Sequence, residues 1–240
     1  MRALTIALLL LCGGCAPDRP ARADGEPPAA DAGSDSRLLW PDAGRPDAGR
    51  SDQAALEPDA FAGKPTVWIV GDSLAVGAGP PAQTLMGAKY TLTVQGKVGA
   101  TISDRFPTVQ SAVAAKADGI VIQAGINDVG GGTANVTQLT ADIGKTLDAT
   151  KGTRCVYWVT YQTKFITGSY LALNKSAPTL DQVIRSEVAK RPGWVHLIDF
   201  QPYIDAHPEL NAADGLHLTT AGYQMLAKFY ADALLTCFGF

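Results

Sequence analysis

Histidine is scarce in this sequence, and there is no excess of basic residues. The 240 residues include three His, and 20 Lys and Arg are set against 23 Asp and Glu, which gives a formal net charge of −3. With an isoelectric point near 5.6 and no basic stripe, the sequence excludes nucleic acid as a partner. A His-Glu-x-x-His motif is also absent, and Cys155 and Cys237 are not grouped with His. We therefore expect no metal site and no cofactor.

No apolar run is long enough to span a membrane. Ala3–Leu11 has roughly nine residues, whereas a transmembrane helix needs about 20. This run follows Arg2, which is typical of a bacterial export signal. The next residues, Leu11-Cys12-Gly13-Gly14-Cys15, resemble the lipobox of bacterial lipoproteins.

The lipobox resemblance implies a signal peptide over residues 1–14 and lipidation of Cys15 after export across the inner membrane. Acyl chains on Cys15 would anchor the protein in the cell envelope, on its periplasmic or cell-surface face. Cleavage after Ala21-Arg22-Ala23 is the alternative, and it would leave no lipid.

Residues 15–63 are rich in Pro, Ala, Asp and Gly and have little to bury. Pro41-Asp42-Ala43-Gly44-Arg45 is followed directly by the same five residues at 46–50. Such a segment cannot bury enough apolar surface to offset the entropy lost on ordering. We therefore expect a disordered tether over 15–63, although the repeat could instead be a ligand motif. One folded domain is expected over 64–240.

The rest of the chain alternates short β-rich runs with helical stretches. The expected strands are 66–71, 90–95, 119–124, 154–161 and 194–200, and the expected helices are 76–86, 103–115, 137–149, 174–190 and 219–235. This alternation predicts an α/β fold of three layers, with a five-stranded parallel sheet between two layers of helices. Ligands of such folds bind at the carboxyl ends of the strands, so we expect the chemistry there.

Gly71-Asp72-Ser73 ends the first expected strand and precedes a helical stretch. A Ser in this place projects its hydroxyl into the crevice, beside the unpaired backbone N–H groups of a helix N-terminus. The alternative is that Ser73 only caps the helix. The Gly-x-Ser-x-Gly elbow is absent, because Val76 and Gly77 do not supply its second glycine at the right place. The α/β-hydrolase family is therefore disfavoured.

Asp214-Gly215-Leu216-His217 precedes the last helical stretch. An Asp three residues before a His, across a turn with Gly, can set its carboxylate against the imidazole and leave the other ring nitrogen free to take a proton. The alternative is a plain loop in which Thr219 or Thr220 caps the helix. Of the other histidines, His196 lies within a strand, where a structural role is expected, and His207 lies in a surface connection. His217 is therefore the candidate base.

Two further groups follow expected strands. In Gly125-Ile126-Asn127-Asp128, the Asn127 amide can donate a hydrogen bond to a developing oxyanion, although Asn and Asp also favour turns and caps. In the run 96–101, a glycine lets a backbone N–H point at a bound group, although it can equally be an ordinary loop glycine.

In this order, the four groups resemble the sequence blocks of the SGNH hydrolases, also called GDSL esterases and lipases. That family has Gly-Asp-Ser, a later Gly, Gly-x-Asn-Asp and a final Asp-x-x-His, which match residues 71–73, 99, 125–128 and 214–217. The resemblance spans nearly the whole expected domain. It implies a flavodoxin-like SGNH fold, with Ser73 as nucleophile, His217 as base and Asp214 as the carboxylate that orients the base.

The same resemblance implies an oxyanion hole made by the backbone N–H groups of Ser73 and Gly99 and the side chain of Asn127. Gly96 is the alternative to Gly99. In the implied mechanism, His217 takes the Ser73 proton as the hydroxyl attacks an ester, and later activates water to release the acid from the acyl-enzyme.

The two cysteines of the expected domain are predicted to meet. Cys155 opens the fourth strand, at the sheet edge opposite the expected site, and Cys237 lies near the end of the last helix, which should reach the same edge. Because exported proteins enter a compartment that permits disulfides, we expect a Cys155–Cys237 bridge. Two buried free thiols are the alternative.

The substrate is less constrained by the residues. A loose similarity to SGNH domains that act on acetylated cell-wall sugars favours short acyl esters, acetyl above all, of carbohydrate or small-molecule alcohols. An envelope O-acyltransferase with the same triad and a non-catalytic glycan-binding surface lipoprotein are the alternatives. Four aromatic residues at or after the fourth strand could line an acyl or sugar pocket, although aromatics there are more often core: Trp158, Tyr161, Phe165 and Tyr170.

Overall fold

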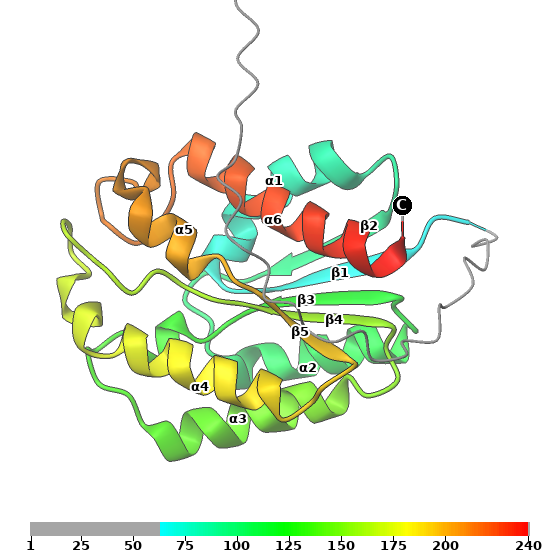
Figure 1. The fold of residues 1–240 in the computed structure, drawn as a ribbon, viewed down its shortest axis with the longest axis horizontal. Coiled ribbons are helices and arrows are strands. Elements are labelled where there is room, and N and C mark those ends of the chain that lie inside the picture. The colour runs from blue at the N-terminus through cyan, green and yellow to red at the C-terminus, as the bar shows by residue number, and fades with distance from the viewer. Residues whose placement is uncertain (1–62, 240) are drawn as a thin grey trace, which may run out of the picture. The chain divides into compact units, whose positions relative to one another are not determined.

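The structure, a computed structural model, describes residues 63–239. Five parallel strands form one sheet in the order β2-β1-β3-β4-β5 (Figure 1). The strands are β1 (Thr66–Gly71), β2 (Thr91–Gly96), β3 (Gly119–Gln123), β4 (Cys155–Val159) and β5 (Val195–Ile198). The predicted α/β class and five-stranded parallel sheet are thereby confirmed. The predicted signal peptide, the lipidation site Cys15 and all of the predicted tether except Gly63 lie outside the described residues.

Helices cover both faces of the sheet. On one face lie α1 (Ser73–Met86) and α6 (Thr220–Phe238), and on the other lie α2 (Ile102–Ala114), α3 (Val136–Ala149) and α4 (Ala177–Ala189) (Figure 1). Four shorter helices complete this part of the chain: α5 (Gln201–Ala206), η1 (Ile126–Val129), η2 (Leu171–Lys175) and η3 (Pro208–Leu210). None of the helices in this range is long and apolar enough to cross a membrane.

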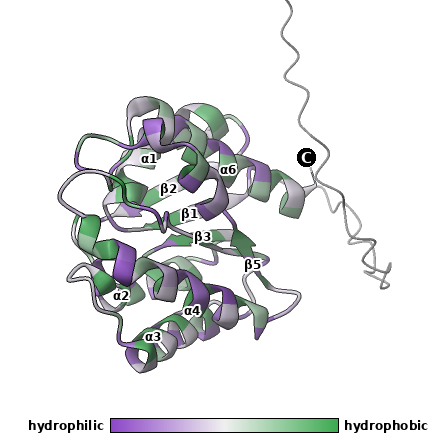
Figure 2. Ribbon diagram, turned by 60° about the vertical axis from the view of Figure 1, so that its left-hand side comes forward, coloured by the Kyte–Doolittle hydropathy of each residue, from purple (hydrophilic) through white to green (hydrophobic). Residues whose placement is uncertain are grey.

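The central strands form the middle of the hydrophobic core. Every residue of β3 and β4 is buried, as expected for parallel strands covered on both faces. The sheet is coloured largely as hydrophobic in Figure 2, whereas the covering helices mix hydrophobic and hydrophilic residues. The helices thus bury one face on the sheet and expose the other.

Local capping explains where the helices depart from the predicted bounds. Helix α1 begins at Ser73 rather than at 76, because the Asp72 carboxylate accepts a hydrogen bond from the Leu74 backbone N–H at 2.9 Å. The predicted helix over 174–190 is two elements, η2 and then α4, and Pro178 lies in the first turn of α4. Helices α5 and η3 were not predicted.

A disulfide between Cys155 and Cys237 joins the start of β4 to the last turn of α6, as the sequence predicts. The two Cα atoms lie 6.1 Å apart, within the usual range for such a bridge. Because the strands are parallel, the start of β4 lies at the amino edge of the sheet, opposite the edge at which Ser73 follows β1.

The strand order sets the place of a binding crevice. The connection after β1 leads to β2 on one side, and the next connection leads to β3 on the other side of β1. A crevice forms at the carboxyl edge of the sheet at such a switch point. The residues that directly follow β1 and β3 are Asp72 and Ala124, so the groups around Ser73 and Asn127 flank this crevice.

Candidate active site

A continuous line of hydrogen bonds joins three of the predicted site residues. The Nε2 atom of His217 lies 2.9 Å from Ser73 Oγ, and its Nδ1 atom lies 2.5 Å from Asp214 Oδ2. Ser73 is the first residue of α1, whereas His217 and Asp214 belong to the turn that precedes α6. This arrangement allows His217 to take a proton from the Ser73 hydroxyl while Asp214 holds the tautomer.

The second oxygen of Asp214 is held by its own turn. Asp214 Oδ1 accepts hydrogen bonds from the backbone N–H groups of Leu216 and His217, each at 3.0 Å. Burial alone would raise the pKa of Asp214, but the hydrogen bonds from the His217 ring and from these two N–H groups outweigh it and hold the pKa below its usual value. Asp214 is therefore an ionised carboxylate at neutral pH, fixed against the imidazole.

The three predicted oxyanion donors come from separate elements at the same edge of the sheet. The Ser73 N–H belongs to the first turn of α1, where backbone N–H groups lack partners within the helix. Gly99 lies in the exposed loop after β2 with φ of +72°, whereas its alternative, Gly96, is a strand residue paired with Gly71. Asn127 lies on η1, after β3.

Asn127 is tied to the Gly99 loop. Its Nδ2 atom donates to the carbonyl oxygen of Ala100 at 3.0 Å. One hydrogen of the amide group makes this bond, and the other can serve a second acceptor. The neighbouring Asp128 accepts from the Ile102 backbone N–H at 3.0 Å, which fixes η1 against the start of α2, and burial raises the pKa of Asp128 to about 6.

Asp72, which the sequence analysis identified only as part of the Gly-Asp-Ser motif, is completely buried and directly precedes Ser73. Its Oδ2 atom accepts a hydrogen bond from the hydroxyl of Tyr161 at 2.7 Å, and its Oδ1 atom caps α1. Burial raises its pKa to about 6, although both hydrogen bonds act in the opposite direction. No motif indicated Tyr161 as its partner, because 89 residues separate the two in sequence.

The other two histidines lie outside this group. His196 is an exposed residue of β5 whose ring lies 5.6 Å from that of Tyr157. His207 contacts the carboxylate of Glu209 at 3.0 Å and the ring of Tyr203 at 4.4 Å.

The four aromatic residues considered for a pocket divide into two sets. Trp158, Tyr161 and Phe165 are buried in the core. Tyr170 is half-buried, and its ring lies edge-on to the His217 imidazole with 6.2 Å between centroids. Of these four aromatic residues, Tyr170 is therefore the one placed to touch a group bound at His217.

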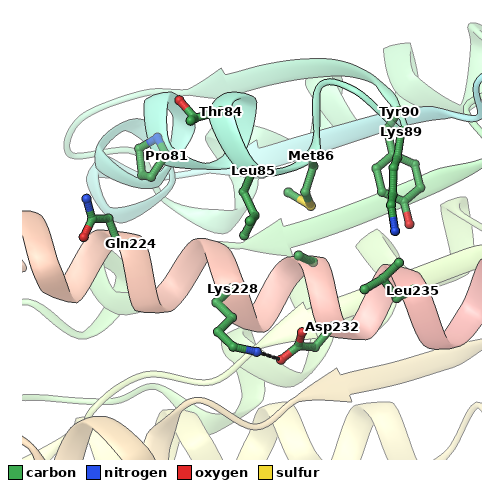
Figure 3. Close-up of a pocket in the computed structure, with 11 residues that line it drawn as sticks. Pro81, Thr84, Leu85, Met86, Lys89, Tyr90, Gln224, Lys228, Asp232 and Leu235 are labelled. Carbon is green, nitrogen blue, oxygen red and sulfur yellow. Dashed lines mark hydrogen bonds and ion pairs between the residues drawn. The ribbon is translucent and has the colours of Figure 1, made fainter. Parts of the chain in front are cut away.

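A groove with a volume of about 710 Å³ does not coincide with the site of Ser73 and His217. It lies between α1 and α6 (Figure 3), and neither Ser73 nor His217 lines it. The side chains of His217 and Asp214 are 32% and 35% exposed, so the line of hydrogen bonds lies at the surface. Within residues 63–239, no group of His, Cys, Asp and Glu side chains could hold a metal ion.

Comparison with known proteins identifies the class. Residues 69–225 match the GDSL-like lipase/acylhydrolase family, so the chain belongs to this family and is a serine ester hydrolase. No curated protein matches the sequence significantly.

Solved structures of low sequence identity share the fold. A lipase/acylhydrolase from Enterococcus faecalis is 16% identical, with a TM-score of 0.57 over 71% of this chain and 95% of its own. The catalytic domain of peptidoglycan O-acetyltransferase A from Streptococcus pneumoniae is 21% identical, with a TM-score of 0.54 over 72% and 94%. An acetyl xylan esterase from Geobacillus stearothermophilus is 18% identical, with a TM-score of 0.56 over 74% and 95%.

Proposed function

We propose that the protein removes short acyl groups, acetyl above all, from carbohydrate esters, with Ser73 as nucleophile, His217 as general base and Asp214 as the orienting carboxylate. The observation that supports this assignment is the unbroken line of hydrogen bonds from Asp214 through His217 to Ser73. A nucleophile within hydrogen-bond reach of a base, which a third group orients, is the pattern of covalent acyl transfer.

In the proposed mechanism, His217 Nε2 removes the Ser73 proton as Oγ attacks the ester carbonyl carbon. The tetrahedral intermediate then collapses, His217 gives the proton to the departing alcohol oxygen, and the acyl group remains on Ser73. Water, deprotonated by His217, attacks this acyl-enzyme and releases the acid. Asp214 keeps a proton on Nδ1 throughout and stabilises the imidazolium that forms in each step.

The charge that develops on the carbonyl oxygen needs donors at the carboxyl edge of the sheet. We assign the backbone N–H groups of Ser73 and Gly99 and the Asn127 side chain to this task. Support comes from their separate but convergent origins, after β1, β2 and β3, and from the bond that holds Asn127 against the Gly99 loop. Donors that are fixed before the reaction stabilise an oxyanion without a cost of reorganisation.

A carbohydrate ester is favoured over a long-chain lipid by the position of the site. The side chains of His217 and Asp214 are each about a third exposed, which leaves room for a bulky polymer to approach. Two proteins with the same fold are an acetyl xylan esterase and a peptidoglycan O-acetyltransferase domain. Both names refer to an acetyl group carried by a polysaccharide. We propose the hydrolase over the transferase because the matching family is one of acylhydrolases.

The test is release of acetate from acetylated xylan and acetylated peptidoglycan, beside p-nitrophenyl esters of increasing chain length. Turnover should fall as the acyl chain lengthens and should be lost in Ser73→Ala. Equal rates for Ser73→Ala and the unchanged protein, with both folded, would refute the assignment. Added acceptor sugars that gain the acyl group in place of water would instead identify a transferase.

A further inference from the structure

The segment that follows β4, residues 160–170, contacts both halves of the site, and we call it the brace segment. Two adjacent side chains reach in different directions. The Tyr161 hydroxyl donates to Asp72 Oδ2 at 2.7 Å, and Gln162 Nε2 donates to the Gly215 carbonyl oxygen at 2.5 Å. Asp72 directly precedes the nucleophile, and Gly215 lies between Asp214 and His217, so one dipeptide bonds to both.

The far end of the brace segment lies against the same turn. The Ser169 backbone N–H donates to the Asp214 carbonyl oxygen at 3.0 Å. Gly168 is so close that a Cβ atom on it would lie 1.8 Å from this oxygen, and its φ of +83° disfavours any other residue. The Tyr170 ring then meets the His217 ring edge-on.

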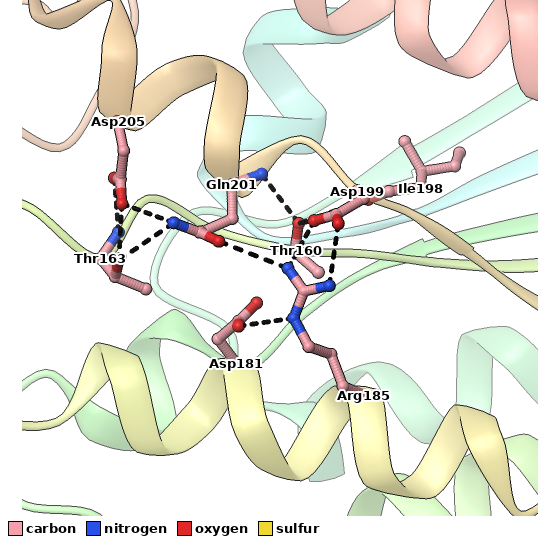
Figure 4. A network of polar contacts seen from close by, with 8 residues as sticks. All are labelled: Thr160, Thr163, Asp181, Arg185, Ile198, Asp199, Gln201 and Asp205. Atoms are coloured by element: carbon pink, nitrogen blue, oxygen red, sulfur yellow. Dashed lines mark hydrogen bonds and ion pairs between the residues drawn. The ribbon is translucent and has the colours of Figure 1, made fainter. Parts of the chain in front are cut away.

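The brace segment is itself held in place by side chains from elsewhere in the chain. Asp205 accepts hydrogen bonds from the backbone N–H and hydroxyl of Thr163 at 2.8 and 2.6 Å, and Gln201 Nε2 donates to Asp205 at 2.6 Å (Figure 4). Asn174 binds both the N–H and the carbonyl of Phe165, at 2.8 and 2.7 Å. The brace segment is therefore fixed by its own hydrogen bonds at the points from which it contacts the site.

The turn with Asp214 and His217 needs such support. It lies outside every helix and strand, and the bridge between Asn211 and Leu218 only closes the turn on itself. Its backbone link to the brace segment is the bond from the Ser169 N–H to the Asp214 carbonyl oxygen. Ser73, by contrast, is held at the junction of β1 and α1. Gln162 is 4% exposed, and its Oε1 atom has no hydrogen-bond partner among the described residues. A buried amide oxygen without a hydrogen-bond partner lowers the stability of the fold. This cost favours a role for Gln162 in positioning the turn over a role in packing alone.

We propose that Tyr161 and Gln162 are positioning residues that set the distance between His217 and Ser73, with Gly168 providing the close backbone contact that keeps the turn in place. The proposal rests on the esterase function proposed above. A displacement of the turn by about 1 Å is enough to cost about 10²-fold in rate.

The chain offers matched controls for two of these residues. Tyr161→Phe removes the hydroxyl that donates to Asp72. Its control, Tyr157→Phe, also removes a tyrosine hydroxyl, but this hydroxyl donates to the Ala233 carbonyl oxygen, away from the site. Gly168→Ala and Gly193→Ala both place a side chain at a φ above +80°, but a Cβ on Gly193 would meet no atom within 4 Å. Gln162→Met keeps the volume and loses the donor.

Steady-state kinetics on a p-nitrophenyl ester should separate the pairs. We expect kcat to fall about 100-fold in Gly168→Ala and about tenfold in Tyr161→Phe and Gln162→Met, with KM within about twofold. Tyr157→Phe and Gly193→Ala should keep their kcat at temperatures where they remain folded. Equal kcat within each pair would overturn the proposal.

A second readout does not depend on turnover. The proton shared by His217 Nδ1 and Asp214 should give a downfield ¹H NMR resonance that Gly168→Ala shifts or loses and Gly193→Ala retains. If the unchanged protein has no activity that Ser73→Ala abolishes, the proposed function fails, and the resonance still decides whether the brace segment positions the turn. An unaltered resonance in Gly168→Ala would overturn the proposal on its own.

Discussion

Replacing Asp72 by Asn should change how the stability of the protein depends on pH. Asn keeps the size of Asp72 and can still cap α1, since an amide oxygen accepts the Leu74 N–H as well as a carboxylate does. It removes the ionisation, and it also puts an amide N–H where Asp72 Oδ2 accepts from the Tyr161 hydroxyl, a change whose cost does not vary with pH. The pH-dependent part of the difference therefore isolates the cost of holding a buried carboxylate next to Ser73.

The magnitude follows from the pKa of Asp72. Burial raises it from 3.8 to about 6, and a shift of this size corresponds to about 3 kcal/mol between the two protonation states. A carboxyl with a raised pKa binds its proton more tightly in the folded state. Its contribution to stability is complete below about pH 4 and is lost as the pH rises through 6. The unchanged protein should lose about 3 kcal/mol over that window that Asp72→Asn does not lose.

Urea unfolding at several pH values between 4 and 8, followed by tryptophan fluorescence, to which the buried Trp158 contributes, measures this difference. The free energy of unfolding of Asp72→Asn, minus that of the unchanged protein, should increase by about 3 kcal/mol from pH 4 to pH 8. Asp104→Asn is the control of opposite sign, because hydrogen bonds from Thr101 lower the pKa of the exposed Asp104. A difference for Asp72→Asn that does not vary with pH would refute the reasoning.

Two further predictions concern the oxyanion donor and the disulfide. Asn127→Ala should lower kcat by roughly 10²–10³-fold in ester hydrolysis. The control Asn135→Ala, which removes the cap of α3, should cost about 1 kcal/mol of stability and leave kcat unchanged. Equal kcat for the two variants would contradict the assignment. Cys155→Ser with Cys237→Ser should destabilise the protein by about 4 kcal/mol, since the bridge spans 82 residues, as measured by urea unfolding. Labelling of both cysteines in the unfolded, unreduced protein would show that no bridge forms.

Patterns local in sequence were enough to predict the sheet. Strand β1 was predicted with its observed bounds, and the other four strands were each predicted within a few residues, because buried parallel strands are short apolar runs between helices. The region after β4 was predicted less well. The strand ends at Val159, and Thr160 and Tyr161 continue as irregular backbone. The Thr160 hydroxyl accepts a hydrogen bond from the Gln201 backbone N–H at the start of α5, and the Tyr161 hydroxyl donates to Asp72, the residue that caps α1.

The site divides in the same way. Ser73, Asp214 and His217 stand in short motifs, and the structure brings them together. Gln162 has no such motif, since its role depends on a bond to Gly215, 53 residues away. Single-sequence patterns record neighbours along the chain, and a contact between distant loops becomes visible only when the fold is known.

The separation of Ser73 and His217 by 144 residues also affects when the enzyme can act. Ser73, the proposed nucleophile, is near the start of the described domain, whereas His217, the proposed base, lies just before α6, the last helix of the described residues. A nascent chain that has not yet been synthesised to residue 217 has its nucleophile but no base. With the roles proposed above, ester hydrolysis therefore requires that nearly all of the domain has been made.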